Sequence, residues 1–169
     1  MIEIRPEQSG DHDAVRELNS AAFNQGPEAS LVDRLRAVCD GYLAFVAVDA
    51  GVVVGHILFT PVTIAGSPVV GMGLAPMAVL PSRQRAGIGL RLVRHGLEHL
   101  RQSGCPFVIV LGHPDYYPRF GFEAAGKHRL RCQWPGVPDG AFMVMVFDRD
   151  RLPRSGGVAQ YRPEFDEAV

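Results

Sequence analysis

A short stretch rich in glycine and arginine, Arg83 to Gly89, has the residue types needed to bind a phosphate. It follows an apolar run that ends before Pro81 and precedes a helical pattern, so its backbone N–H groups would lie at the start of a helix. Such N–H groups lack intrahelical partners and lie at the positive end of the helix dipole. Glycines have no Cβ atom and let a phosphate approach these groups closely. We therefore expect this turn to bind a phosphate-bearing ligand.

Two common phosphate-binding motifs do not fit this turn. The dinucleotide-binding pattern G-x-G-x-x-G requires a third glycine where this chain has Leu92. A P-loop requires Gly-Lys-Ser/Thr, and the only lysine of the chain is Lys127. The turn instead contains Q-x-x-G-x-G, over Gln84 to Gly89. A second motif, Y-x-x-x-G-F over Tyr117 to Phe122, follows one helix and one strand later.

The segment after the turn has the period of an amphipathic helix. Small or apolar residues recur three and four positions apart, and polar residues occupy the other face. The expected buried stripe consists of Gly89, Leu92, Val93, Gly96, Leu97 and Leu100. Gly104 is typical of a helix C-terminus, and Phe107 to Leu111 is a second strand-like run. A strand, a turn, a helix and a strand would thus position both motifs.

The N-terminal part of the chain predicts one strand followed by two helices. Ile2 and Ile4 alternate with polar residues and indicate the strand. Asp11 or Asp13 can cap a first helix that runs to Phe23. A second helix is expected over residues 29–39, with one apolar side formed by Leu31, Leu35 and Val38.

Apolar runs separated by turns predict further strands over residues 42–48, 52–64, 69–80 and 140–147, with a loop over residues 134–140. The mixture of helices and strands indicates an α+β fold. We expect a single domain over residues 1–150 and leave the polar tail, residues 151–169, unassigned.

Composition narrows the class of protein. The chain has 169 residues with 17 basic and 18 acidic side chains, so a nucleic acid or an anionic membrane is not expected as a partner. The cysteines Cys39, Cys105 and Cys132 are far apart, which fits reduced intracellular thiols. No signal peptide or membrane-length apolar run is visible, so we expect a cytoplasmic protein.

The two motifs, in this order, resemble those of the GNAT superfamily of N-acetyltransferases. The phrase Gly-Leu-x-Pro-Met-Ala-Val at Gly73 to Val79 and the run from Leu111 to Phe122 look most like the YhbS-like branch. The resemblance implies a central mixed, mostly antiparallel sheet flanked by helices. It also implies acetyl-CoA as co-substrate and direct transfer of its acetyl group to a primary amine of a small molecule or a protein, within a ternary complex. The alternative is a non-catalytic or regulatory acyl-CoA-binding module on the same scaffold.

The resemblance also assigns roles to residues. Tyr117, four residues before Gly121, takes the position of the general acid that protonates the leaving thiolate. The backbone of Met77, Ala78 and Val79 would pair with the pantetheine arm and hold the thioester carbonyl. The amides of the turn would hold the pyrophosphate, which makes Gln84, Arg85, Ala86, Gly87, Ile88, Gly89 and Leu90 the other coenzyme-binding residues.

The general base is less well defined by the sequence. Many relatives carry a glutamate on the strand before the glycine turn, but residues 69–80 contain no carboxylate. His113 follows the second apolar strand, and an imidazole titrates near neutral pH. Asp115, Glu123 and a chain of waters are alternatives. Relatives often have an asparagine where Val110 stands, so contacts to the coenzyme thiol in that region are expected to differ.

Acceptor residues are expected in two loops, residues 24–28 and 133–142. Trp134 and Phe142 could form an apolar wall, Glu28 or Asp139 could hold an ammonium group, and His56 is either a core histidine or a substrate residue. A homodimer through the last strand or the tail is compatible with the sequence.

One rival motif is present on the predicted helix. His95 to His99 matches H-x-x-E-H, a zinc-binding pattern. Both histidines lie on the polar face of a helix that begins with Q-x-x-G-x-G, so we expect a solvated face and no metal.

Overall fold

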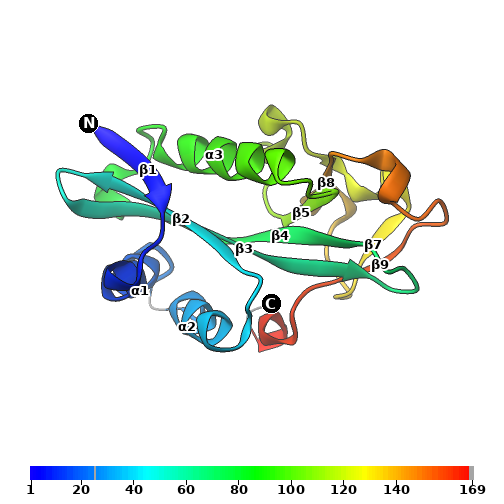
Figure 1. The fold of residues 1–169 in the computed structure, drawn as a ribbon, viewed down its shortest axis with the longest axis horizontal. Coiled ribbons are helices and arrows are strands. Elements are labelled where there is room, and N and C mark those ends of the chain that lie inside the picture. Colours follow the sequence, from blue (N-terminus) through cyan, green and yellow to red (C-terminus); the bar gives the residue numbers. More distant parts are fainter. Residues whose placement is uncertain (25, 168–169) are drawn as a thin grey trace. The chain divides into compact units, whose positions relative to one another are not determined.

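The computed structural model describes residues 1–24 and 26–167 (Figure 1). The chain forms two compact units. Unit 1 contains Met1–Phe59, Pro76–Leu97 and Pro163–Val169, and unit 2 contains Thr60–Ala75 and Glu98–Arg162.

Three α-helices and a mixed sheet make up the regular structure of the described residues. The helices are α1 (His12–Ala22), α2 (Glu28–Val38) and α3 (Ile88–Gln102). The strands are β1 (Ile2–Pro6), β2 (Leu43–Asp49), β3 (Val52–Ile64), β4 (Val70–Val79), β5 (Phe107–Leu111), β6 (Glu123–Ala124), β7 (Leu130–Cys132), β8 (Phe142–Val146) and β9 (Gly157–Gln160).

The strands pair in the order β1-β2-β3-β4-β5-β8-β6, and β9 pairs with β3 and β7. The β4–β5 and β7–β9 pairs are parallel, whereas the β1–β2, β2–β3, β3–β9, β5–β8 and β6–β8 pairs are antiparallel. This mixed, mostly antiparallel sheet with helices confirms the predicted fold class. No helix in the described ranges combines the length and the apolar character needed to cross a bilayer.

In unit 1, α3 packs on one face of β2 and β3, while α1 and α2 lie on the opposite face (Figure 1). Close packing of α3 depends on Gly55 of β3, because a Cβ atom there would lie 2.9 Å from Ile88 and from Leu92. The predicted stripe of α3 is confirmed, since Leu92, Val93, Leu97 and Leu100 are buried. The start of α3, and with it the glycine turn, is therefore fixed against the sheet.

Unit 2 contains the β5–β8 pairing that carries the second motif. Phe107 to Leu111 pair antiparallel with Val146 to Phe142, and Glu123 and Ala124 pair with Val144 and Met143. The motif Tyr117 to Phe122 lies between β5 and β6, and its first residues form a 3₁₀ turn, Tyr117–Phe120. The motif is therefore held between two strands that both pair with β8.

Several local predictions were wrong. Val38 is 57% exposed because it is the last residue of α2, and α2 buries Ala29, Leu31, Val32 and Leu35 instead. Asp11 occupies the N-cap position of α1 without capping it, since its carboxylate binds Arg5 and the Gln8 N–H. The last predicted strand begins at Phe142, two residues later than predicted, because a 3₁₀ turn precedes it.

The segment left unassigned by the sequence contains regular structure. Its described part, residues 151–167, includes β9 and a 3₁₀ turn at Pro163–Glu167. Tyr161 and Phe165 are buried apolar residues of this segment. β7 is a further strand that the sequence did not predict, and it pairs with β9.

Candidate active site

The glycine turn is attached to the end of β4 by local hydrogen bonds. The Leu80 N–H donates to the Val54 carbonyl at 3.0 Å, and the Arg83 N–H donates to the Leu80 carbonyl at 2.8 Å. The side-chain amide of Gln84 donates to the Val79 carbonyl at 3.2 Å. Gln84, predicted to contact the coenzyme, thus has a structural contact that fixes the turn to the strand.

The backbone of the turn has N–H groups without a partner in the helix. The first backbone hydrogen bond of α3 runs from the Arg91 N–H to the Gly87 carbonyl at 3.1 Å, so the N–H groups of residues 88–90 have no intrahelical partner. Gly87 has a φ of +82°, and a Cβ atom built on it would meet nothing within 4 Å. Arg85 has a φ of +65°, a strained conformation that is common at ligand sites. These features fit a bound phosphate.

The arginines beside the turn have different surroundings. Arg83 donates to Asp49 at 2.6 Å. Hydrogen bonds from Arg83 and from the N-terminal ammonium hold the pKa of Asp49 below its usual value. Arg85 is exposed and forms no ion pair within the part of the chain that the structure describes. Arg85 is therefore the cation available to an anionic ligand.

Met77, Ala78 and Val79 form the end of β4. The pairing of β4 with β5 comprises Met72 with Val108 and Gly73 with Ile109. β4 continues to Val79 beyond these pairs, so the backbone groups of residues 77–79 are not used in this parallel ladder. This arrangement is compatible with a ligand that pairs with the end of the strand.

In unit 2, Tyr117 is held by aromatic neighbours and by Gly112. Its ring centroid lies 5.1 Å from that of Tyr116 and 5.7 Å from that of Phe122, both in edge contacts. Tyr117 is only 9% exposed. Burial, with a smaller effect of Tyr116, raises the pKa of Tyr117 to about 12. The phenol is therefore protonated at neutral pH and can act as a proton donor.

The Tyr117 ring lies directly on Gly112, which makes Gly112→Ala a test of ring position. A Cβ atom on residue 112 would lie 3.0 Å from Cδ2 of Tyr117 and closer still to Cε2, so the ring must move. Because small displacements of a reacting group are costly, we expect kcat to fall at least about 10-fold with little change in coenzyme affinity. Steady-state kinetics beside calorimetry would measure both. Gly126→Ala is the matched control, since its Cβ atom meets nothing within 4 Å, and an equal effect there would contradict the argument.

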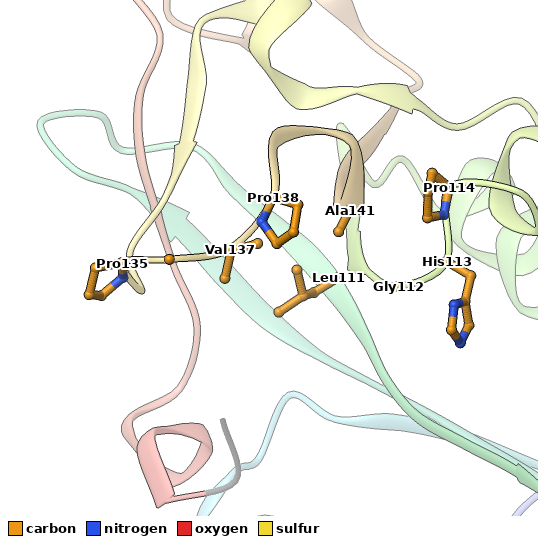
Figure 2. A pocket seen from close by; sticks show the side chains of 9 residues that line it. Leu111, Gly112, His113, Pro114, Pro135, Val137, Pro138 and Ala141 are labelled. Atoms are coloured by element: carbon orange, nitrogen blue, oxygen red, sulfur yellow. The ribbon is translucent and has the colours of Figure 1, made fainter.

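His113 is one of the residues that line a pocket in unit 2 (Figure 2). The pocket measures about 430 Å³ and is lined by residues 111–114 on one side and by residues 135–138 with Ala141 on the other. His113 is exposed, and its carbonyl accepts hydrogen bonds from the N–H groups of Tyr116 and Tyr117 at 3.1 and 3.3 Å. The structure therefore brings His113 and Tyr117 into one local segment.

The other predicted acceptor residues are not brought together. Trp134 packs on Tyr161, with ring centroids 5.1 Å apart, and Phe142 is buried; neither lines the pocket. Glu28 lies in unit 1 and has one buried carboxylate oxygen without a hydrogen-bond partner among the described residues. Gln25, in the same predicted loop, lies outside the described residues. Glu123, an alternative base, is bound to His128 at 2.6 Å.

His56 is part of the core of unit 1. Its side chain is 0% exposed, and its Nε2 lies 3.4 Å from a carboxylate oxygen of Glu7. Glu7 also pairs with Arg36 of α2. A fully buried ring cannot contact an acceptor directly in this conformation, so a role in holding Glu7 is better supported than substrate contact.

The buried His56 and Glu7 predict a pH dependence of stability. Burial lowers the pKa of His56, and Glu7 opposes this only in part. Burial raises the pKa of Glu7, but hydrogen bonds from His56 and Arg36 outweigh it and the net pKa is lowered. Since an unfolded histidine titrates near pH 6.5, the unfolded chain takes up a proton that the folded chain resists. The contribution of His56 to stability is therefore fully present above pH ~6.5 and decreases as the pH falls below it. Glu7 adds a further loss of stability below pH ~4.3.

We accordingly expect the free energy of unfolding to fall by up to about 1.4 kcal/mol between pH 7.5 and 5.5 on account of His56. Urea unfolding at these two pH values would measure the fall. In His56→Gln the fall should shrink. If the wild type and the variant lose the same stability, His56 does not remain neutral in the fold.

The H-x-x-E-H residues have other contacts. Glu98 accepts hydrogen bonds from Arg101 at 2.6 Å and from Gln102 at 2.9 Å. His95 packs edge-on against Phe45, with centroids 4.7 Å apart. Among the described residues, no group of three or more His, Cys, Asp or Glu side chains could hold a metal ion.

Sequence reasoning missed two features of these regions. The Glu7–His56 contact joins residues from different elements, and no local pattern marks it. The pocket wall at Pro135, Val137 and Pro138 was assigned only as a loop. The two prolines of this loop restrict its backbone and could have indicated that the loop is rigid.

A glycine turn at a helix N-terminus, a strand end before it that extends beyond the β4–β5 ladder and a buried tyrosine after the next strand are features expected of an acyl-CoA-dependent acyltransferase. The chain belongs to the GNAT acetyltransferase family: residues 3–125 match the model described as "Acetyltransferase (GNAT) domain".

Two relatives are similar over most of the chain. The uncharacterized N-acetyltransferase YhbS of Escherichia coli strain K12 is 37% identical over 166 residues, which are 96% of this chain and 98% of YhbS. The uncharacterized N-acetyltransferase YjhQ of the same strain is 47% identical over 135 residues, 76% of this chain and 74% of YjhQ.

Two solved structures are similar over most of their length. The crystal structure of YhbS from Escherichia coli in complex with CoA has a TM-score of 0.90 and 38% identity, covering 98% of this chain and 92% of that one. A GNAT family acetyltransferase from Brucella melitensis in complex with acetyl-CoA has a TM-score of 0.81 and 36% identity, covering 98% and 99%.

Proposed function

We propose that this chain transfers the acetyl group of acetyl-CoA directly to a primary amine of a small molecule or a protein, in a ternary complex. The observation that carries the proposal is the turn after β4, where strained backbone, unpaired helix N–H groups and Arg85 together fit a diphosphate. The CoA complex of YhbS, at 38% identity, supports the same ligand.

Each part of the coenzyme would be bound by a different part of the chain. The amides of residues 85–90 bind the diphosphate, with Arg85 adding a full positive charge. The backbone of Met77, Ala78 and Val79 binds the pantetheine arm and polarises the thioester carbonyl. Gln84 holds the turn in place through Val79.

Tyr117 is the proposed general acid. The amine nitrogen forms a bond to the carbonyl carbon, and the carbon–sulfur bond then breaks with its electron pair on sulfur. Tyr117 gives its proton to that sulfur. The amine nitrogen loses one proton to the base, and the phenolate is reprotonated from solvent before the next turnover. A pKa of about 12 means that the phenol carries its proton at neutral pH.

His113 is the proposed base that accepts the proton of the amine. It is exposed and belongs to the same loop as Tyr117. It is also the only titratable side chain among the residues that line the pocket.

A thiol-release assay with acetyl-CoA and a panel of primary amines tests the proposal. We expect amine-dependent release of CoA, with an equal amount of acetylated amine found by mass spectrometry. The competing function, a non-catalytic acyl-CoA-binding module, predicts binding of acetyl-CoA without release of thiol for any amine in the panel.

A further inference from the structure

The pocket in unit 2 has an apolar lining, whereas a site for a polycation would need acidic side chains. Leu111, Val137, Ala141 and three prolines supply its walls, and none of its lining residues is an aspartate or a glutamate (Figure 2). An ammonium group bound in such a pocket would lack a counter-ion and would lose hydration. The pocket therefore favours an uncharged, apolar group.

The pocket begins where the proposed acid is held. Gly112 lines the pocket and also contacts the Tyr117 ring. The ring lies so close to Gly112 that it leaves no room for a Cβ atom on residue 112. Figure 2 shows His113 and Pro114 at one end and Pro135 at the other. A ligand in the pocket would therefore have one end next to His113 and Gly112 and the other end near Pro135.

The walls of the pocket are held together by backbone hydrogen bonds. The Gly112 N–H donates to the Ala141 carbonyl and the Ala141 N–H donates to the Pro138 carbonyl, both at 2.9 Å. The prolines restrict the backbone of the facing loop. A volume of about 430 Å³ is within the usual range for small-molecule sites. The pocket is thus largely preformed.

We infer that this pocket binds the apolar body of the acceptor, so that the acceptor is an aryl-alkyl or branched-alkyl primary amine with its nitrogen at the His113 end. The inference rests on the proposed function and specifies its substrate class. The acyl chain of the thioester is a weaker occupant, because the pocket contains none of the residues assigned to the coenzyme. Several of its lining residues are exposed, so an amine can enter from solvent.

The test uses 2-phenylethylamine and spermidine as probes. Binding of each to the full chain in the presence of CoA is measured by ligand-observed NMR, and turnover is measured separately with acetyl-CoA. Val137→Glu places a carboxylate in the pocket on a partly exposed loop, where folding is expected to tolerate it. Val70→Glu is the matched control, because Val70 is 48% exposed in the same unit and does not line the pocket.

We expect the wild type to bind 2-phenylethylamine more tightly than it binds spermidine. Val137→Glu should weaken the binding of 2-phenylethylamine at least 10-fold and should strengthen the binding of spermidine. Val70→Glu should change neither. Val137→Ala, which only shortens the side chain, should weaken 2-phenylethylamine about 3-fold.

Failure of 2-phenylethylamine to bind, or equal binding to the wild type and Val137→Glu, would overturn the inference. The inference would also be overturned if Val137→Glu changed only the preference between acetyl-CoA and butyryl-CoA. The pocket would then hold the acyl chain. Binding with the expected variant pattern but without any turnover would contradict the proposed function and support the pocket as a site for apolar amines.

Discussion

Tyr117→Phe is expected to lower kcat for acetyl transfer by about 10²- to 10³-fold, because the departing thiolate loses its proton donor. The ring itself stays in place, since its contacts with Gly112, Tyr116 and Phe122 involve carbon atoms that phenylalanine keeps. Affinity for acetyl-CoA should therefore change little. Steady-state kinetics and calorimetry on the same preparation would separate the two effects.

Tyr116→Phe is the control for this variant. Tyr116 is the neighbouring tyrosine, and Arg119 lies over its ring at 4.5 Å, a contact that phenylalanine largely retains. We expect less than about a 5-fold change in kcat, well below the range for loss of an acid. Equal losses in the two variants would show that the phenol of Tyr117 has no special role in the chemistry.

Gly87→Glu is expected to raise the Kd for CoA by about 10²-fold or more. The substitution places a carboxylate in the open space in front of the helix N-terminus, where a diphosphate is proposed to bind. Repulsion between like charges at about 4 Å is worth several kcal/mol near a protein surface. The left-handed φ adds strain of about 1–2 kcal/mol to the fold, which a stable domain tolerates.

Gly104→Glu separates the charge effect from the strain. Gly104 has a φ of +86°, close to the +82° of Gly87, and a Cβ atom on either residue meets nothing within 4 Å. The two variants should lose similar stability in urea unfolding, but only Gly87→Glu should lose CoA binding. A similar Kd for both variants would place the diphosphate elsewhere.

Features with a regular period were predictable from the sequence. The stripe of α3 and its end near Gly104 follow from spacing that packing against β3 requires. The bounds of β3 agreed with the prediction because turn residues border an apolar run on both sides. The glycine turn was recognisable since its chemistry depends on consecutive residues of one segment.

Features that join distant segments were not predictable. Asp11 looked like a helix cap, but Arg5 of β1 binds its carboxylate. His56 was ambiguous because its partner Glu7 is 49 residues earlier in the chain. The pocket combines the end of β5 with a proline loop more than 20 residues later, and only the folded chain brings Leu111 near Val137.

The central claim is that the turn after β4 binds the diphosphate of acetyl-CoA. Calorimetric titration of the full chain with this co-substrate tests the claim most directly. The account predicts one molecule bound per chain with a Kd on the order of 1–100 μM, binding that is weakened by salt, and a Kd about 10²-fold or more higher in Gly87→Glu. Absence of binding, or undiminished binding by Gly87→Glu, would contradict it.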